Sequence, residues 1–285
     1  FIDASKSFAD KELFPYIQEM DEQPAHHKDG KVFVHDQVKT MMEEGGDLGV
    51  ISGPFDYEDG GMQIPLLAQT ASNYILDAAN NHLPGYAGLT QGAAELIIHF
   101  ASQALKDTYV PNMLAGKWGG TMCLTEPQAG SSLSDIVTKA TPTENGHYHI
   151  SGQKIFISGA DNQFSENIVH LLLARIEGAQ KGTKGISLFV VPKNRPDGKG
   201  GLTPNDVTSV ADFQKMGQRG YCTTHLGFGD AGDCQGYLVG EANKGLSYMF
   251  LMMNAARIGV GRGASAIASA AYQASLQYAN ERPQG

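Results

Sequence analysis

Positive charge is scarce in this sequence. Its 285 residues hold 21 Lys and Arg against 30 Asp and Glu, which gives a formal net charge of −9. A nucleic-acid-binding domain needs a surplus of basic side chains to neutralise phosphates, so nucleic acid is not an expected partner. A phosphate-bearing ligand would have to be held locally, by a few backbone N–H groups and one or two cations.

Cysteines and long apolar runs are also few. The cysteines are Cys123, Cys222 and Cys234. They are odd in number and include no CxxC spacing, so the sequence predicts neither a disulfide framework nor a zinc site, and it fits a reducing compartment. The richest apolar stretch, residues 248–260, is interrupted by Asn254 and Arg257, so no membrane span is expected. With 41% hydrophobic residues, the chain can still bury a sizeable core.

Sequence patterns of several other active sites are absent or incomplete. There is no GxSxG, HExxH or Walker motif. His26-His27 and the pair His147 and His149 lack a third ligand at a recognisable spacing, so we expect no metal site. Residues 259–264 match GxGxxA, but the stretch before them has helical periodicity where a dinucleotide-binding loop needs a strand. We therefore expect tight helix packing there.

The chain divides into three parts of different character. Residues 1–115 carry apolar residues at helical spacing and predict an N-terminal α-helical domain. Residues 116–235 carry short β-prone runs between turn residues, with Asn145-Gly146 as the strongest hairpin signal. Residues 236–285 become rich in alanine and predict the first helix of a C-terminal helical domain, packed in a bundle or across subunits. The expected strands are 121–125, 136–140, 147–150, 155–158, 168–174 and 186–191.

The connections between these β-prone runs are too short to hold crossover helices. Because parallel strands need such a crossover, we expect the central sheet to be antiparallel. The predicted fold class is therefore α+β, with an N-terminal helical domain, a central antiparallel β domain and the start of a C-terminal helical bundle.

Two segments of the β domain carry the most specific signal. The run CLTEPQAGSSLSD covers residues 123–135, and GQKIFIS covers residues 152–158. Both are predicted strand ends that open into polar loops, where main-chain N–H groups can hold an extended ligand. Either segment alone is equally well explained by a sheet edge whose hydroxyl groups bond to their own loop. Their order along the chain makes the pair more informative than either one.

These segments resemble signatures of the acyl-CoA dehydrogenase family, with Phe156 and Ser158 at positions where that family usually has Trp and Thr. Further matches follow in the family's order: GTKGISLFVVP at 182–192, KMGQR at 215–219, NAAR at 254–257 and Glu281-Arg282. The similarity covers nearly the whole chain and leans toward the bacterial branch that includes 3-methylmercaptopropionyl-CoA dehydrogenase. It implies a cytoplasmic bacterial enzyme with FAD as its cofactor. The family has a C-terminal helical domain, so we expect this sequence to be a fragment that lacks it.

The resemblance also implies roles for particular residues. One strand end would line one side of the flavin ring, and the other would cover the opposite side and hydrogen-bond near the redox-active nitrogen. The first set is Met122, Leu124 and Thr125, and the second is Phe156, Ile157 and Ser158. In the loop between them, Gly130 permits close backbone approach, and Ser131 can bind oxygen atoms of a phosphate or of the substrate's pantetheine. Ser132 stands where the family usually has Asp.

Positions in the last helix are implied as well. Asn254 and Arg257 match positions beside the acyl-CoA, and Arg257 lies on an apolar helical face, where a buried guanidinium needs an anion or carbonyl groups. Arg282, with Gln284 beside it, matches an Arg that reaches the FAD pyrophosphate of a neighbouring subunit. Alternatives stay open at both places, because Arg257 could reach solvent or pair with an acid, and Arg282 could lie at a solvated helix end.

The reaction implied by the resemblance is α,β-dehydrogenation of an acyl-CoA. A Glu removes the α-proton, and the flavin accepts the β-hydride. Ala256 occupies the place where a minority of the family has this base, and no Glu lies between Glu241 and Glu281, so we expect the base beyond Gly285. Electron-transferring flavoprotein or a similar acceptor is the expected partner, and FAD shared between subunits implies a homodimer or larger assembly. An acyl-CoA oxidase, a flavin monooxygenase of the same fold and a noncatalytic flavin- or CoA-binding module remain as alternatives.

Overall fold

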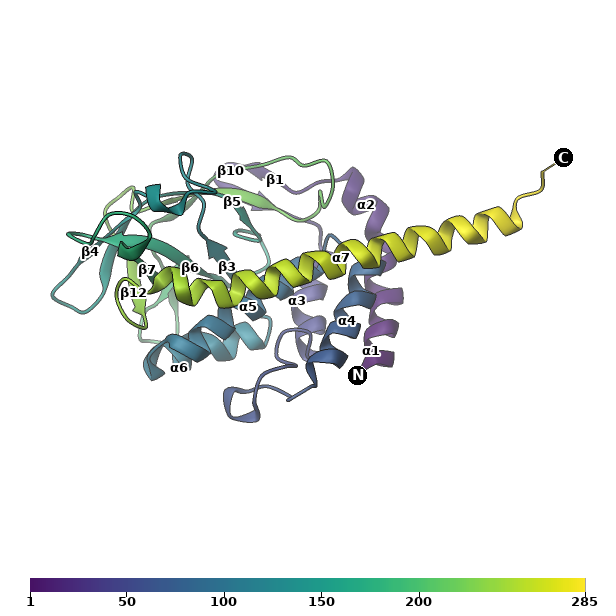
Figure 1. Cartoon of the computed structure of the whole chain (residues 1–285), viewed down its shortest axis with the longest axis horizontal. Coiled ribbons are helices and arrows are strands. Elements are labelled where there is room, and N and C mark those ends of the chain that lie inside the picture. Colours follow the sequence, from purple (N-terminus) through teal and green to yellow (C-terminus); the bar gives the residue numbers. More distant parts are fainter. Residues whose placement is uncertain (285) are drawn as a thin grey trace.

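The computed structural model describes residues 1–284 and shows a group of helices beside a β domain, with one long helix running along both (Figure 1). The N-terminal helices are α1 (Ile2–Phe8), the π-helical turn η1 (Ala9–Leu13), α2 (Ile17–Glu22), α3 (Gln37–Asp47), α4 (Leu66–Ala79), α5 (Pro84–Phe100) and α6 (Gln103–Leu114). Single 3-10 turns lie at Phe14–Tyr16, Tyr57–Asp59, Leu133–Asp135 and Thr183–Gly185. Helix α5 packs against α6, the sheet and the C-terminal helix, which explains why it is apolar on most faces.

A short hairpin interrupts the N-terminal helices. It consists of β1 (His26–Lys28) and β2 (Lys31–Phe33), joined by Asp29-Gly30, which both have positive φ as a two-residue hairpin turn requires. His27 Nε2 lies 2.9 Å from the carbonyl oxygen of Ser209, so the hairpin packs on the β domain. The expectation of a purely helical segment over residues 1–115 is wrong at this point, because an Asp-Gly turn signal lies between stretches of helical periodicity.

The β domain contains more strands than the sequence predicts. They are β3 (Trp118–Cys123), β4 (Lys139–Pro142), β5 (Tyr148–Ser158), β6 (Asn167–Ile176), β7 (Ile186–Pro192), β8 (Asn194–Pro196), β9 (Leu202–Pro204), β10 (Val207–Asp212), β11 (Thr223–Phe228) and β12 (Gln235–Val239). The expected strands 147–150 and 155–158 form the single strand β5. Strand β12 continues to Val239, beyond the expected boundary at residue 235, before the chain enters its last helix.

The strand pairing closes a ring. Going round it, β4 pairs with β5, β5 with β12, β12 with β7, β7 with β6, and β6 again with β4. Strands β11 and β10 extend the sheet from β5, and β3 extends it from β6. The expectation of a wholly antiparallel sheet is wrong, because β3 and β4 both run parallel to β6. Strands supply these crossovers: the chain passes through β4 and β5 between β3 and β6, so no helix is needed.

Two hydrophobic cores hold the molecule together. The smaller core lies between strands of the ring and includes Ile150, Phe189 and Phe228. The larger core joins the N-terminal helices to the other face of the sheet, and its members include Leu96 and Ile97 of α5 and Leu171 of β6. Because α5 packs directly on β3, the position of the strand end after Cys123 depends on this contact.

Gly120 makes the contact between β3 and α5 possible. A Cβ atom at Gly120 would lie 2.7 Å from Ala93 Cβ and 3.0 Å from Thr90 Cα, whereas one at Gly119 would meet its nearest neighbour at 3.4 Å. We expect Gly120→Ala to lower the free energy of unfolding by about 1–3 kcal/mol through overpacking, and the matched variant Gly119→Ala to be near neutral. Urea unfolding of both variants measures the difference, and equal stabilities would contradict this account of the contact.

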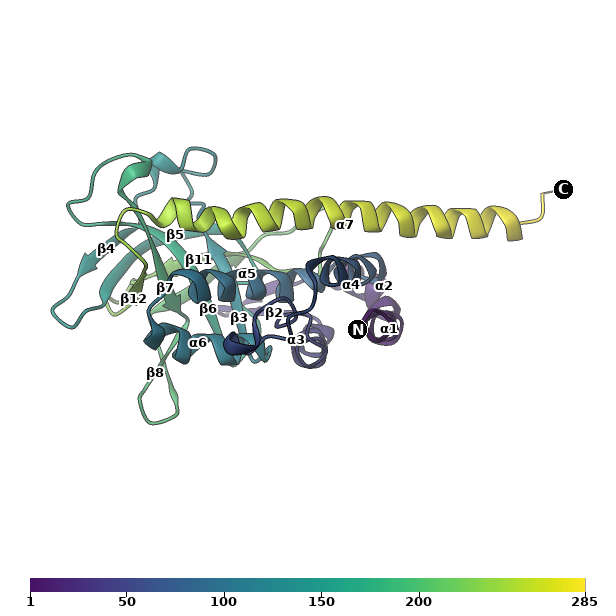
Figure 2. The same cartoon turned by 60° about the horizontal axis from the view of Figure 1, so that its bottom comes forward.

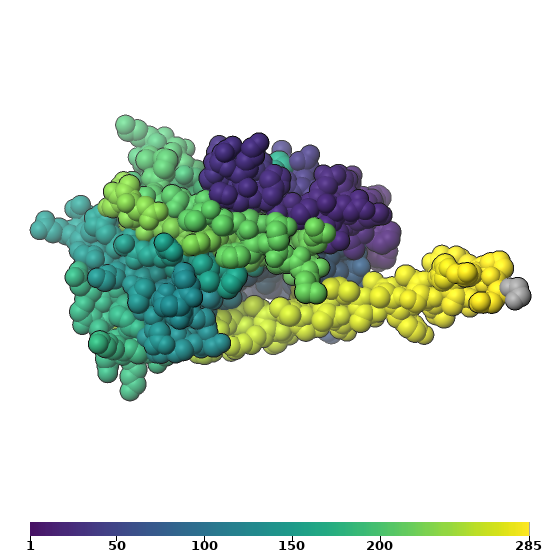
Figure 3. Space-filling model, turned by 90° about the horizontal axis from the view of Figure 1, so that it is seen from above, coloured from purple at the N-terminus to yellow at the C-terminus, as the bar shows by residue number. Residues whose placement is uncertain are grey.

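The last helix, α7 (Gly245–Glu281), is the longest element of the chain with 37 residues. Its first half lies along the body of the molecule, and its last turns extend beyond it (Figures 1 and 2). The space-filling view shows a hollow between α7 and the green part of the β domain (Figure 3). Among residues 1–284, no helix combines the length and the apolar character that crossing a membrane requires.

Candidate cofactor site

The ends of β3 and β5 meet at one place on the β domain. The backbone N–H of Ile155 donates to the carbonyl oxygen of Thr125 over 2.9 Å, which joins the two motifs directly. Leu124 is 8% exposed and packs in the larger core, Ile157 is 2% exposed and packs in the smaller core, and Thr125 and Ser158 are half-buried. Within residues 1–284, neither hydroxyl group has a protein hydrogen-bond partner. The structure therefore brings two hydroxyl groups without protein partners to neighbouring strand ends.

A buried ion pair connects the same two motifs from below. Lys154 of β5 is 0% exposed, and its Nζ lies 2.9 Å from Glu126 Oε1 and 2.9 Å from the carbonyl oxygen of Leu124. The carboxylate of Glu126 also accepts hydrogen bonds from the backbone N–H groups of Val137 and Thr138. Burial alone would raise the pKa of Glu126, but the Lys154 ammonium and these donors outweigh it and hold the pKa below its usual value. Glu126 is therefore ionised and is bound to two other segments of the chain, one at Lys154 and one at Val137 and Thr138.

Phe156 adopts a backbone conformation that few aromatic residues adopt. Its φ is 58°, and the pairing of β5 with β11 shifts register between Ile157 and Lys154, which identifies a β-bulge. Positive φ in a bulky residue costs of order 1–3 kcal/mol, and such strain gathers at functional sites. The bulge leaves the Phe156 ring 56% exposed, with its centroid 4.6 Å from that of Phe213. The exposed ring of Phe156, with the half-buried Phe213 beside it, thus borders the Ser158 end of the site.

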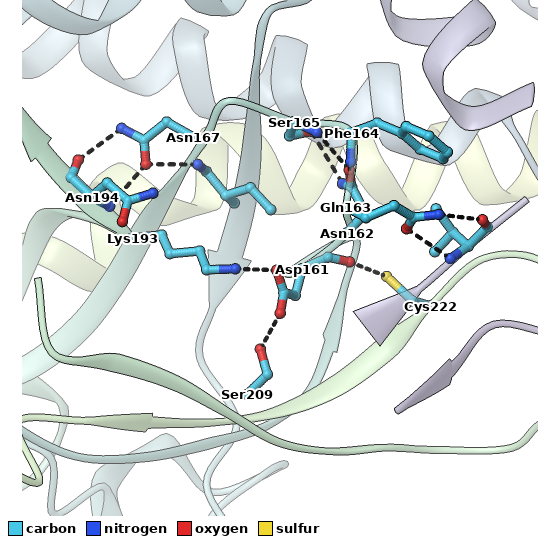
Figure 4. Close-up of polar contacts among 12 residues, drawn as sticks. Asp161, Asn162, Gln163, Phe164, Ser165, Asn167, Lys193, Asn194, Ser209 and Cys222 are labelled. Atoms are coloured by element: carbon cyan, nitrogen blue, oxygen red, sulfur yellow. Dashed lines mark hydrogen bonds and ion pairs between the residues drawn. The ribbon is translucent and has the colours of Figure 1, made fainter. Parts of the chain in front are cut away.

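The loop after Ser158 is fixed by a polar network (Figure 4). Asp161 is 2% exposed; its carboxylate accepts a hydrogen bond from Ser209 Oγ at 2.6 Å and pairs with Lys193. The backbone oxygen of Asp161 accepts from Cys222 Sγ at 3.2 Å. Asn162 Oδ1 accepts hydrogen bonds from the backbone N–H groups of Phe164 and Ser165 in the same loop. This network holds the C-terminal end of β5 in place without using the Ser158 side chain.

The loop that follows Thr125 is more open. Gly130, Ser131 and Ser132 are all exposed. Ser132, at the position where the resemblance leads one to expect Asp, hydrogen-bonds Ser134 over 2.7 Å, and Ser134 in turn donates to Asp135. An open groove with a volume of about 550 Å³ lies beside this loop. Its lining includes Ser134, Asp135, Lys139, Arg175 and Lys181.

The predicted residues of α7 lie apart from this junction. Arg257 is exposed, and its Nη1 donates to Asn254 Oδ1 over 2.9 Å, so the two predicted substrate residues bind each other. The expected guanidinium on a buried apolar face is therefore not found within residues 1–284. The reason is rotational: five residues after the buried Met252, Arg257 points about 140° away from it around the helix. Arg282 and Gln284 are exposed at the far end of the chain, where Arg282 donates to Tyr278 Oη at 2.6 Å.

Comparisons with known proteins agree with the geometry. Residues 1–117 match the model for the acyl-CoA dehydrogenase N-terminal domain, and residues 121–231 match that for the acyl-CoA dehydrogenase middle domain. The chain belongs to the acyl-CoA dehydrogenase family. It is 42% identical over 266 residues to 3-methylmercaptopropionyl-CoA dehydrogenase of Ruegeria pomeroyi, which covers 93% of this chain and 45% of that protein. It is 30% identical to a probable acyl-CoA dehydrogenase of Bacillus subtilis over 98% of this chain and 67% of the relative.

The fold is that of solved acyl-CoA dehydrogenases. A crystal structure of an acyl-CoA dehydrogenase from Bacillus anthracis, complexed with FAD, superposes with a TM-score of 0.81 at 24% identity. The superposition covers 99% of this chain and 44% of that one. The family assignment expected from the two β-domain motifs is therefore confirmed, and this acyl-CoA dehydrogenase-family chain spans less than half the length of its Ruegeria relative.

Sequence reasoning did not assign a role to the buried pair of this family member. Lys154 and Glu126 both lie inside the quoted motifs, but they are 28 residues apart in the chain, so no local spacing links them. A usable signal existed, because a Lys flanked by Gln153 and Ile155 in a β-prone run alternates onto the buried face. Such a buried lysine needs a carboxylate, and Glu126 is the acid in the neighbouring motif.

Proposed function

We propose that the full-length protein is an FAD-dependent enzyme that removes hydrogen from Cα and Cβ of an acyl-CoA thioester. The observation that carries the proposal is the hydrogen-bonded junction of Thr125 with Ile155, three residues before Ser158. Near this junction lie two hydroxyl groups without protein partners, the buried apolar side chains of Leu124 and Ile157, and the exposed ring of Phe156. These are the features that a flat, polar-edged ring system needs from a protein. The FAD complex of the Bacillus anthracis relative supports the same cofactor.

The residues present fit FAD. Thr125 and Ser158 would hydrogen-bond to the flavin ring without titrating, Met122 and Leu124 would line one side, and Phe156 and Ile157 the other. FAD supplies the hydride acceptor when it is bound. Arg282 and Gln284, exposed at the end of the chain, are proposed to reach the cofactor of a neighbouring subunit in a homodimer or larger assembly.

Acyl-CoA is proposed to lie beside the loop at Gly130 and Ser131. Both residues are exposed, and the groove next to them carries Lys139 and Lys181, two cations for the phosphates of a CoA group. Asn254 and Arg257 would approach the same ligand from α7. The net negative charge of the chain makes such local cations more important, since the molecule as a whole repels anions.

The general base is proposed to be a Glu outside this sequence. Removing an α-proton needs a carboxylate near the reacting carbon, and α7 has no acidic residue before Glu281 at its exposed end. The residues around Thr125 would bind and orient the cofactor and the substrate without taking a proton. Reduced cofactor would pass its electrons to electron-transferring flavoprotein or a similar acceptor.

The absorbance spectrum of the purified full-length protein tests this function. We expect flavin bands that bleach when an acyl-CoA from a panel of chain lengths is added without oxygen, and that return slowly in air. Bleaching followed by fast return in air would instead identify an oxidase or a monooxygenase. A protein without flavin bands, or with bands that no acyl-CoA bleaches, would contradict the proposed reaction.

A further inference from the structure

Helix α7 touches the rest of the molecule at two separate places. Near its start, Met249 and Met252 are buried, and further along Gly263 and Ala266 are buried. Between these contacts Ala256 and Gly259 are half-buried, and the other side of the helix is exposed, with Ile258 and Val260 75% and 74% exposed. Residues 254–261 therefore form a largely exposed span of α7, the helix that borders the hollow beside the β domain (Figure 3).

The second contact is built around one partly buried ion pair. Arg262 Nε lies 3.1 Å from Asp77 Oδ2 of α4, and the Asp77 side chain is 7% exposed. Gly263 allows the helices to approach, because a Cβ there would lie 3.3 Å from Asn81 Nδ2 and 3.4 Å from Asp77 Oδ2. Among the described residues, this is the one ion pair that joins α7 to the N-terminal helices.

The same ion pair continues into the β domain. Asn81 Nδ2 donates to Asp77 Oδ1 over 3.1 Å, and Gln218 Nε2 donates to Asn81 Oδ1. Gln218 has a φ of 49°, a strained value for this residue type that persists only where its surroundings fix it. We call Arg262, Asp77, Asn81 and Gln218 the bracket, because these four side chains link α7 to the loop between β10 and β11 across one end of the hollow.

The loop at the other end of the bracket is tied to the candidate cofactor site. Lys215 Nζ donates to Thr223 Oγ1 over 2.9 Å, and Thr223 pairs with Ser158 in the sheet. The backbone N–H of Gly220 donates to His82 Nδ1, and Tyr86 Oη donates to the carbonyl oxygen of Gly220. The loop therefore cannot move without disturbing either the Ser158 strand or the start of α5.

We propose that the bracket sets the separation between α7 and the Ser158 side of the site, and that its four residues are positioning residues for acyl-CoA. The role in substrate binding rests on the proposed function; the structural role does not. Because each link is a side-chain contact in series, breaking any one of them frees the span 254–261 from the loop. The cofactor contacts at Thr125 and Ser158 stay intact, so substrate affinity should fall while the chemical step is preserved.

Two single variants and their combination test the proposal in the full-length protein. Arg262→Ala removes the ion pair, and Gln218→Ala breaks the exposed end of the bracket without leaving a buried charge. We expect each to raise the KM for acyl-CoA about tenfold, with kcat within about twofold. The KM of the double variant should be no higher than that of the stronger single variant, because breaking one contact already interrupts the series. Lys244→Ala is the matched control, since it removes an exposed ion pair with Glu241 at the start of the same helix.

Hydrogen exchange of the amides in residues 254–263 gives a readout that needs no activity. We expect faster exchange in both single variants and no change in Lys244→Ala. If exchange quickens but wild type oxidises no acyl-CoA, the bracket stands and the proposed function fails. The proposal would be overturned if Gln218→Ala changed neither hydrogen exchange nor KM. It would also be overturned if the fold-changes in KM of the two single variants multiplied in the double variant.

Discussion

Replacing Lys154 with methionine in the full-length protein should lower the free energy of unfolding by about 3–5 kcal/mol. The Lys154 side chain is 0% exposed and lies 2.9 Å from Glu126 Oε1, so the substitution leaves the Glu126 carboxylate buried without a cation. Methionine fills much of the space of the lysine stem, so the loss comes from the unpaired charge and not from a cavity. Urea unfolding of wild type and variant measures the difference.

The double variant Lys154→Met with Glu126→Gln is the matched control. The N–H groups of Val137 and Thr138 bind different oxygens of Glu126, so the amide oxygen of the new Gln can still accept from one of them, and no charge remains buried. We expect it to recover most of the stability lost in the single variant, because removing both partners avoids an isolated buried ion. A double variant as unstable as the single one would show that packing, not charge pairing, holds the two motifs together.

The same pair should make part of the stability depend on acid pH. The pKa of Glu126 in the folded protein lies below its ordinary value of 4.5, because Lys154 and the backbone donors outweigh the effect of burial. The contribution of the ionised carboxylate is therefore fully present above pH 4.5 and is lost as the pH falls through the lower folded-state pKa. Glu126→Gln should remove this part of the acid dependence.

Removing both hydroxyl groups at the strand ends should weaken FAD binding about tenfold to a hundredfold, since each hydrogen bond is worth about 1 kcal/mol. The variant is Thr125→Val with Ser158→Ala, which keeps the size of both side chains close to wild type. Neither hydroxyl group has a protein partner within residues 1–284, so the fold should lose little stability. Titration of the apoprotein with FAD, followed by flavin fluorescence, measures the affinity.

Thr208→Val is the matched control for the hydroxyl variant. Thr208 is an exposed strand residue of β10, on the same extended sheet but outside the junction of the two motifs. We expect it to bind FAD as wild type does. Should the double variant also retain full affinity, the cofactor cannot be held at these strand ends, and the proposed site would have to be abandoned.

Much of the local structure follows from the sequence alone. Asn145-Gly146 predicts the turn between β4 and β5, and the β-prone runs locate most strands of the β domain, because turn and strand preferences act over a few residues. The motifs at 123–135 and 152–158, together with the further matches that follow in the family's order, indicate the family, which the comparisons confirm. The order of the motifs is read directly from the sequence and needs no coordinates.

The tertiary structure decided what distant residues do to one another. Strands β3 and β6 pair in parallel because the chain crosses between them through other strands. An antiparallel sheet is expected from the sequence when only helices are considered as crossovers. The pairing of Lys154 with Glu126 and the bracket from Arg262 to Gln218 join residues that lie far apart in the chain, so no local spacing indicates these contacts. Burial and charge pairing depend on which surfaces come together in space, and the spacing of residues along a chain does not record that.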